Sequence, residues 1–590
     1  MAKPSKPKTG KTRKVAASPA VTETASTPKS PKSKKNSKVA VSETATEAAS
    51  TSALSRQEQK ELKRKARRER QEFIGFLTTM SFISLVLGAP LFVVGGVRAA
   101  LGGAIGILCL AFSFKYPRKA LWAFLIYMPF SGTVVYGLAG GNALMQLAKD
   151  IFYIPAAIGI FMECRRTGKP FILPKEIVPW FTILMVICML VLLSVNGAQA
   201  FAPASTALKP PAPENPIAMG ILGLKALLGY LPLIGCAYYL VRDKKDLLFT
   251  MRLHVVLALT CCALGFIQFL LLKTGRCQAT TGTGVDLFKA SVQSRCFVGG
   301  ALLYSPEFGA IRLPGTFVAP WQWGWFLIAN AFIIFASAFS EPSILWRPVS
   351  LVSLASVFVM SVISGQRIAL ALVPLATVAL LVITGQVTNL KRFIPVGIGL
   401  GLILGGAAAA NPAIVQDRVQ SFIDRWNASP PTAFISEQLS WALDQGGALG
   451  HGLGRATNAA RAFGDVKLIE TYYPKVIYEI GVTGTIVFLI MVSVLTYVTF
   501  KAYRSVKDRV LRSYGASLWT FVLFISYNTY YYPLDVDPVA VYYWFFAGII
   551  LTLPKIARQE QEKLDAIAMP ESKVKKGKRK RLPEPTPAPT

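Results

Sequence analysis

The chain has 590 residues, of which 53% are hydrophobic and only 16% are charged, yet its formal net charge is +33. A single water-soluble core cannot bury so much apolar sequence, so the composition excludes an ordinary soluble globular protein. Much of the positive charge lies in two polar tails, residues 1–72 and 557–590, which have too few apolar residues to form a core and are expected to be disordered.

Between the tails, one apolar run follows another, each long enough to cross a hydrocarbon layer of about 30 Å. About fourteen spans are expected, or about twelve if the weakest are discounted, and residues 73–556 are therefore predicted to form an all-α polytopic membrane domain. The runs lie at 73–95, 99–114, 120–137, 143–162, 176–196, 217–241, 249–273, 319–340, 346–364, 366–386, 393–410, 476–500, 514–532 and 538–556.

Basic residues recur in alternate loops of this arrangement, at 115–119, 165–169, 242–245, 391–392 and 501–509. The positive-inside rule then predicts an inner (plasma) membrane protein with both termini in the cytoplasm and with the loops at 197–216, 274–318 and 411–475 outside. The basic tails are interpreted as partners of anionic lipids rather than of nucleic acid, because the first span follows the N-terminal tail directly.

The external loops at 274–318 and 411–475 contain more arginine and lysine than the positive-inside rule favours. Arginine grips phosphate with two parallel hydrogen bonds, so these loops predict an anionic ligand such as a diphosphate. Cys277 and Cys296 lie in the first loop, on the oxidising side of the membrane, and are predicted to form a disulfide. The other six cysteines lie in or beside apolar runs, where packing is the simpler interpretation.

No sequence signature of a soluble enzyme is present: the chain has no P-loop, no zinc-protease helix and no calcium-binding loop. It contains only two histidines, His254 and His451, which makes a histidine-built metal site improbable. We expect neither a metal nor another cofactor.

Three patches, in their order along the chain, resemble the O-antigen ligase and polymerase superfamily, whose members move glycans from undecaprenyl diphosphate at the outer face of the inner membrane. They are Arg-Leu-Pro-Gly-Thr-Phe-Val-Ala-Pro at 312–320, Ser-Gly-Gln-Arg at 364–367, and the glycines at 450, 452 and 454 with the segment 470–484. Segments 116–124, 141–144, 239–246 and 313–324 further resemble the HpsL family of cyanobacterial hormogonium polysaccharide biosynthesis proteins.

This resemblance implies catalytic roles for three residues. Arg312 and Arg367 match positions that bind the diphosphate, and Glu470 falls where many relatives carry histidine. A carboxylate there could take the proton of the acceptor hydroxyl or only orient the acceptor. The alternatives are a simple loop cation for Arg312 and a side chain snorkelling at a helix start for Arg367.

A second group, Arg455, Glu479, Gly452 and Gly454, is predicted to bind substrate. Glu479 falls inside a span, where an ionisable group is costly and is therefore read as functional by default. Its alternative is a hydrogen bond that packs one helix against another. For the glycines, the alternative is a tight turn that needs no ligand.

The resemblance implies a fold like that of C-type glycosyltransferases and a metal-independent enzyme that ligates or polymerises a lipid-diphosphate-linked glycan for exopolysaccharide synthesis. Its partners would be an undecaprenyl-diphosphate-linked donor, a glycan or other acceptor, and polysaccharide export proteins. Two alternatives stay open: a flippase or transporter of the lipid-linked glycan, and a non-catalytic scaffold of an export machine. Large loops concentrated on one face favour a site at that face over a transporter built from repeats.

Overall fold

The computed structural model describes residues 56–138, 140, 141, 145, 148–201, 214–307, 309–386 and 412–568, with isolated positions between 398 and 409. The chain divides into two units, residues 1–72 and 73–590. The first described helix begins at Arg56, and the last one continues to Ala568.

The described residues are mostly helical and contain two strands of three residues each, so the all-α prediction is confirmed in its coarse form. The α-helices are α2 Arg56–Gly88, α3 Leu91–Lys115, α4 Pro117–Tyr127, α5 Ala148–Arg166, α6 Val178–Val191, α7 Gly197–Ala200, α8 Pro216–Leu228, α9 Leu233–Leu240, α10 Lys244–Lys273, α11 Gly284–Gln293, α12 Pro320–Ser340, α13 Trp346–Ile363, α14 Arg367–Ile383, α16 Pro412–Ala428, α17 Pro431–Gly446, α18 Tyr472–Ser505, α19 Arg509–Tyr527 and α20 Val539–Ala568. Short helical turns are η1 Met128–Phe130, η2 Thr133–Leu138, η4 Leu192–Asn196, η6 Asn458–Ala462 and η7 Pro533–Asp535. Strands β1 Leu303–Ser305 and β2 Ala310–Arg312 pair antiparallel, with Leu303 opposite Arg312.

Within the described residues, eight helices are long and apolar enough to cross a membrane, or nine if α8 and α9 together form one span. The expected count of about fourteen stays a prediction, and most of the run at 393–410 lies outside the described residues. The run at 217–241, expected as one span, is divided into α8 and α9, which meet at an angle of 46°. Large apolar side chains such as Phe82, Val93 and Leu193 are 71%, 87% and 69% exposed, as expected for helices that face lipid.

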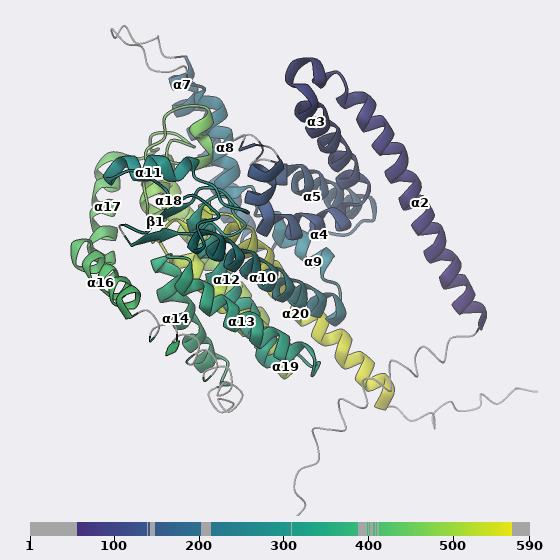
Figure 1. Cartoon of the computed structure of the whole chain (residues 1–590). Helices are drawn as coiled ribbons and strands as arrows, with labels where there is room; N and C mark the ends of the chain where they lie inside the picture. The colour runs from purple at the N-terminus through teal and green to yellow at the C-terminus, as the bar shows by residue number, and fades with distance from the viewer. Residues whose placement is uncertain are drawn as a thin grey trace, which may run out of the picture. The chain divides into compact units, whose positions relative to one another are not determined.

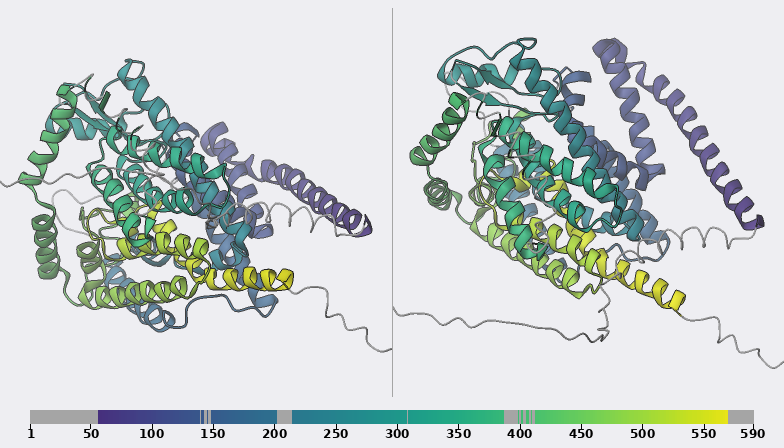
Figure 2. Two further views of the ribbon diagram at one scale, coloured as in Figure 1. Left: turned by 90° about the horizontal axis from the view of Figure 1, so that it is seen from below. Right: turned by 60° about the horizontal axis from the view of Figure 1, so that its bottom comes forward.

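The core is built around α12, whose residues are buried from Trp323 to its end at Ser340. Helices α10, α13, α14 and α19 pack against it (Figure 1). Aromatic side chains fill the space between them, and Trp323, Trp325, Phe326 and Phe335 are fully buried. Helix α20 runs beside α18 and α19, as both views of Figure 2 show.

The elements expected outside the membrane gather at one end of the second unit. Helices α11 and α17 and strand β1 lie toward the upper left of Figure 1, whereas the C-terminal end of α20 points to the lower right. The segments that carry the predicted site residues belong to this same unit.

Candidate functional site

The two segments that carry Arg312 and Arg367 contact each other through their backbones. The N–H of Leu313 donates to the carbonyl oxygen of Ser364 at 3.0 Å. Gly365 has φ +70°, and a Cβ atom there would lie 1.8 Å from the carbonyl oxygen of Ile311, so only glycine permits this approach. Arg312 ends β2 and Arg367 begins α14, and both arginines are exposed.

The start of α12 links this pair of segments to the segment of Glu470. Gly324 is packed so closely on Gln366 that a Cβ atom at 324 would lie 3.2 Å from Cβ of Gln366. One residue on, Nε1 of Trp325 donates to the carbonyl oxygen of Tyr531 at 3.1 Å. The N–H of Tyr531 in turn donates to the carbonyl oxygen of Glu470 at 3.0 Å. The three predicted catalytic residues therefore lie on segments joined by an unbroken chain of contacts.

Helix α17 holds the backbone around Glu470 in place. Oε1 of Gln438 accepts hydrogen bonds from the N–H of Glu470 at 3.2 Å and from the hydroxyl of Thr471 at 2.8 Å. Within the described residues, nothing donates a hydrogen bond to the partly exposed carboxylate of Glu470. The Glu470 carboxylate is thus open to a ligand, while its backbone is fixed.

The glycine-rich segment packs against a break in α18. At Gly481, where φ is +73°, the helix is interrupted, and the N–H of Val482 donates to Gly447 instead of to its own helix. The freed carbonyl oxygens of Tyr478 and Glu479 accept from the N–H groups of residues 451 and 452 at 2.7 and 3.2 Å. The segment and the broken helix therefore complete each other's backbone hydrogen bonds.

Gly452 and Gly454 are buried against neighbouring protein atoms. A Cβ atom on Gly454 would lie 2.0 Å from the carbonyl oxygen of Met219, and one on Gly452 would lie 3.1 Å from the Asn196 side chain. Asn196, which the sequence analysis did not single out, donates to the carbonyl oxygen of Leu453 and accepts from its N–H. Close packing thus requires glycine at both positions, and their role in substrate binding stays a prediction.

Arg455 is held by two protein side chains. Its guanidinium donates to Glu214 at 2.7 Å and to Gln199 at 2.8 and 2.9 Å, and its side chain is 16% exposed. Burial works to raise the pKa of Glu214, but hydrogen bonds from Arg455 and from the N–H of Asp465 outweigh it and lower that pKa. Arg455 therefore ties the 455–465 segment to the start of α8.

Glu479 lies in a small pocket between α8, α18 and η7. The lining residues are Gly223, Ala226, Leu227, Thr457, Tyr472, Lys475, Val476, Glu479, Ile480 and Asp535. Oε1 of Glu479 accepts from the N–H of Ala456 at 2.8 Å and from the hydroxyl of Thr457 at 2.9 Å. Beside it, Lys475 and Asp535 form a salt bridge of 2.6 Å. The sequence analysis identified Glu479 but missed Asp535 and the pairing of Lys475.

Two more ion pairs lie beside this pocket, near Asp535. Lys149 on α5 pairs with Asp537, and Lys225 on α8 pairs with Asp150 at 3.0 Å. Burial alone would raise the pKa of Asp537, but the ammonium groups of Lys149 and Lys225, together with a hydrogen bond from Tyr230, lower it. None of these residues was predicted, because the sequence does not show which charges of different apolar runs meet.

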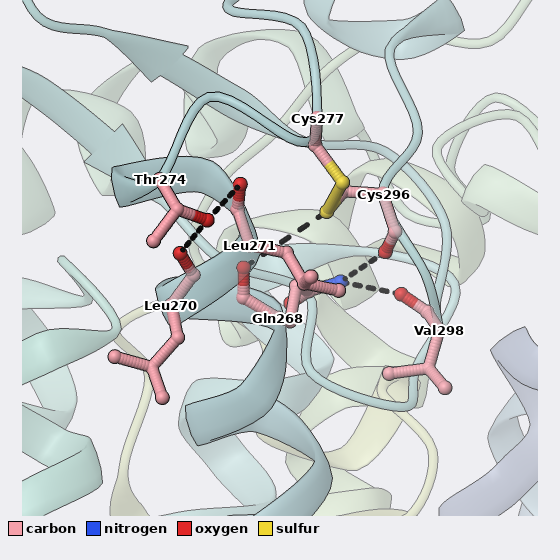
Figure 3. Close-up of a disulfide and its surroundings, with 7 residues drawn as sticks. All are labelled: Gln268, Leu270, Leu271, Thr274, Cys277, Cys296 and Val298. Carbon is pink, nitrogen blue, oxygen red and sulfur yellow. Dashed lines mark hydrogen bonds between the residues drawn. A yellow bond between two sulfur atoms is a disulfide. The ribbon is translucent and has the colours of Figure 1, made fainter.

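The predicted disulfide between Cys277 and Cys296 is confirmed, with the two Cα atoms 5.6 Å apart (Figure 3). Nε2 of Gln268 on α10 donates to the carbonyl oxygens of Cys296, at 2.9 Å, and of Val298. The residues that follow pair with the patch at 312–320: the N–H groups of residues 300 and 301 donate to the carbonyl oxygens of 317 and 318 at 2.7 and 2.9 Å. The disulfide therefore lies at the base of the segment that follows Arg312.

Among the described residues, no group of three or more His, Cys, Asp or Glu side chains has an arrangement that could hold a metal ion. No protein-family model and no curated protein matches the sequence.

Proposed function

We propose that the chain is a membrane glycosyltransferase of the O-antigen ligase and polymerase type. It transfers or polymerises a glycan carried on undecaprenyl diphosphate at the external face of the inner membrane, in exopolysaccharide synthesis of the hormogonium type. Its spans, about fourteen, follow the C-type glycosyltransferase fold, and both of its termini are cytoplasmic.

The observation that carries this proposal is the backbone contact between the β2 end at Arg312 and the α14 start at Arg367. Two exposed guanidinium groups on adjoining segments suit a diphosphate, whose departing charge must be stabilised during transfer. The first turn of α14 adds the positive end of a helix dipole beside Arg367.

Glu470 supplies the group that addresses the acceptor. Its backbone is fixed by Gln438 and Tyr531, so its partly exposed carboxylate is held at a defined place. A positioned carboxylate can take a proton from an acceptor hydroxyl or orient that hydroxyl for attack.

The test is glycan transfer from purified lipid-linked donor by the full chain in nanodiscs. Replacing Arg312 or Arg367 by lysine keeps the charge but loses the planar fork, so a large loss of transfer is expected. Arg276→Lys, at an exposed position of the same external region, is the matched control and should keep normal transfer. Glu470→Gln should lower the transfer rate on the order of a hundredfold while donor binding persists.

Normal transfer by Arg367→Lys and Glu470→Gln would remove the catalytic assignment. The species that accumulates in cells without the protein then separates the remaining functions. Unpolymerised repeat units on lipid indicate a polymerase, and long lipid-linked chains indicate a ligase. Lipid-linked units trapped on the cytoplasmic side indicate a flippase. If none of these species accumulates, the protein is a scaffold.

A further inference from the structure

A partly buried charge cluster includes the pocket of Glu479 and continues beside it. It consists of three lysines and four carboxylates contributed by α5, α8, α18 and the segment 533–538: Lys149, Asp150, Lys225, Lys475, Glu479, Asp535 and Asp537. The three aspartates each form an ion pair with one of the three lysines. Within the described residues, Glu479 has no cation within 4.0 Å, so with every group ionised the cluster would hold one negative charge in excess.

The other side chains near Glu479, on its own helix and on neighbouring elements, do not balance this charge. Cys188 on α6 faces it, as do Tyr472 and Tyr478 on its own helix, and none of these side chains carries positive charge. Arg455, on the adjoining loop, already pairs with Glu214 at 2.7 Å. Lys475 is the nearest cation, and its ammonium group is taken by Asp535.

The hydrogen bonds at Glu479 match those of a neutral acid. Both donors, the N–H of Ala456 and the hydroxyl of Thr457, reach the same oxygen, Oε1. With both donors on Oε1, the other oxygen, Oε2, is left to carry a proton, as in a protonated carboxyl group. Glu479 itself is only 4% exposed, and an uncompensated charge at such a site is strongly disfavoured.

We propose that Glu479 is a proton-binding site: at neutral pH it is a neutral acid, with the proton on Oε2, and this proton completes the charge balance of the cluster. The evidence for this proton is independent of the transfer reaction proposed above.

Release of this proton would have a defined structural consequence. An ionised Glu479 would compete with Asp535 for Lys475, because the pocket brings all three side chains together. Asp535 follows the segment that holds Glu470 through Tyr531. Proton occupancy at Glu479 therefore controls how firmly the Glu470 segment is anchored.

The experiment is infrared difference spectroscopy on the full chain in nanodiscs at neutral pH. Glu479→Gln keeps a carbonyl oxygen for Ala456 and Thr457 and should lose one carbonyl band of a protonated carboxyl group. Glu470→Gln, a partly exposed carboxylate of the same region, should keep that band. An unchanged band in Glu479→Gln would overturn the proposal.

Two further measurements keep the test decisive if Glu479→Gln folds poorly. Uniform 13C labelling of glutamate in the unmodified chain must shift the same band, and a band that stays in place contradicts the assignment. Asp535→Asn removes one negative charge and frees Lys475, so Glu479 should ionise and the band should disappear. Persistence of the glutamate band in Asp535→Asn would show that charge balance does not govern the site.

Discussion

Gly365 and Ile311 meet backbone to backbone, so closely that a Cβ atom on Gly365 would lie 1.8 Å from the carbonyl oxygen of Ile311. This contact holds the Arg312 strand against the turn that leads to Arg367, and it has no room for a side chain. The relation predicts that a single methyl group can separate the two arginines without altering either one.

Gly365→Ala is therefore expected to reduce glycan transfer strongly, with both arginines intact. Gly309→Ala is the matched control, because Gly309 also has a positive φ, +55°, but has open space where the Cβ atom would lie. Both variants bear the backbone cost of about 1–2 kcal/mol for a left-handed alanine, and only Gly365→Ala adds a collision. Equal transfer by the two variants would contradict the role given to this contact.

Removal of one partner of the Lys475–Asp535 pair should destabilise the protein. Both side chains are at most 6% exposed, so Lys475→Met leaves a buried carboxylate without its cation and should lower the free energy of unfolding by about 3–5 kcal/mol. The double variant Lys475→Met/Asp535→Leu should recover much of this loss. Unfolding in detergent measures it, and Lys289→Met, at a pair that is 73% and 79% exposed, should change little.

The Glu214–Arg455 pair predicts a dependence of stability on acid. Because the pKa of Glu214 is lowered in the folded protein, its contribution is complete above the ordinary glutamate value of about 4.3 and is lost as the pH falls through the lowered value. The thermal midpoint of the unmodified chain should exceed that of Glu214→Gln at pH 7, and this difference should vanish in strong acid. Glu437→Gln, at an exposed position of α17, is the control. A difference that is constant with pH would argue against the pairing.

Loss of the disulfide should weaken the external region. It closes a loop with a sequence separation of 19 residues, so Cys277→Ser should lower the free energy of unfolding by about 2–4 kcal/mol. Transfer should also fall, because the loop pairs with residues 317 and 318 next to the Arg312 strand. Cys109→Ala removes a free cysteine elsewhere and should leave the response to reductant unchanged. If reductant does not alter the melting temperature of the unmodified chain, the disulfide does not contribute to its stability.

Sidedness can be tested by labelling single cysteines in whole cells. A membrane-impermeant reagent should reach a cysteine introduced at position 430, at the start of α17, but not one at position 30. The reason is the alternation of basic loops around the spans. Labelling at 30 but not at 430 would invert the topology and move every candidate residue to the cytoplasmic face.

The sequence predicts the long helices well, because an apolar run of sufficient length has few alternatives. It predicts their interruptions poorly. At the break in α18, a Cβ atom on Gly481 would lie 2.1 Å from the carbonyl oxygen of Ala448 and 2.8 Å from the backbone nitrogen of Leu449. Those contacts join residues that are distant in the chain, and a local pattern contains no information about them.

The same distinction applies to the candidate site. Arg312, Arg367 and Glu470 could be found because they lie in patches that resemble a family, and the disulfide because only two cysteines lie in a loop that is expected to be external. Lys149, Lys225 and Asp537 could not, because their significance depends on a partner far away in the sequence. The pairing of a buried charge becomes visible only when the helices are assembled.

The enclosure of α12 also bears on how the protein is made. Of the helices packed around it, only α10 precedes it in the chain, whereas α13, α14 and α19 are synthesised later. After its synthesis, α12 must therefore be surrounded by lipid or by the insertion machinery until its later neighbours have been synthesised. Chains truncated before α19 should consequently be recognised by membrane quality control, although every helix they contain is complete.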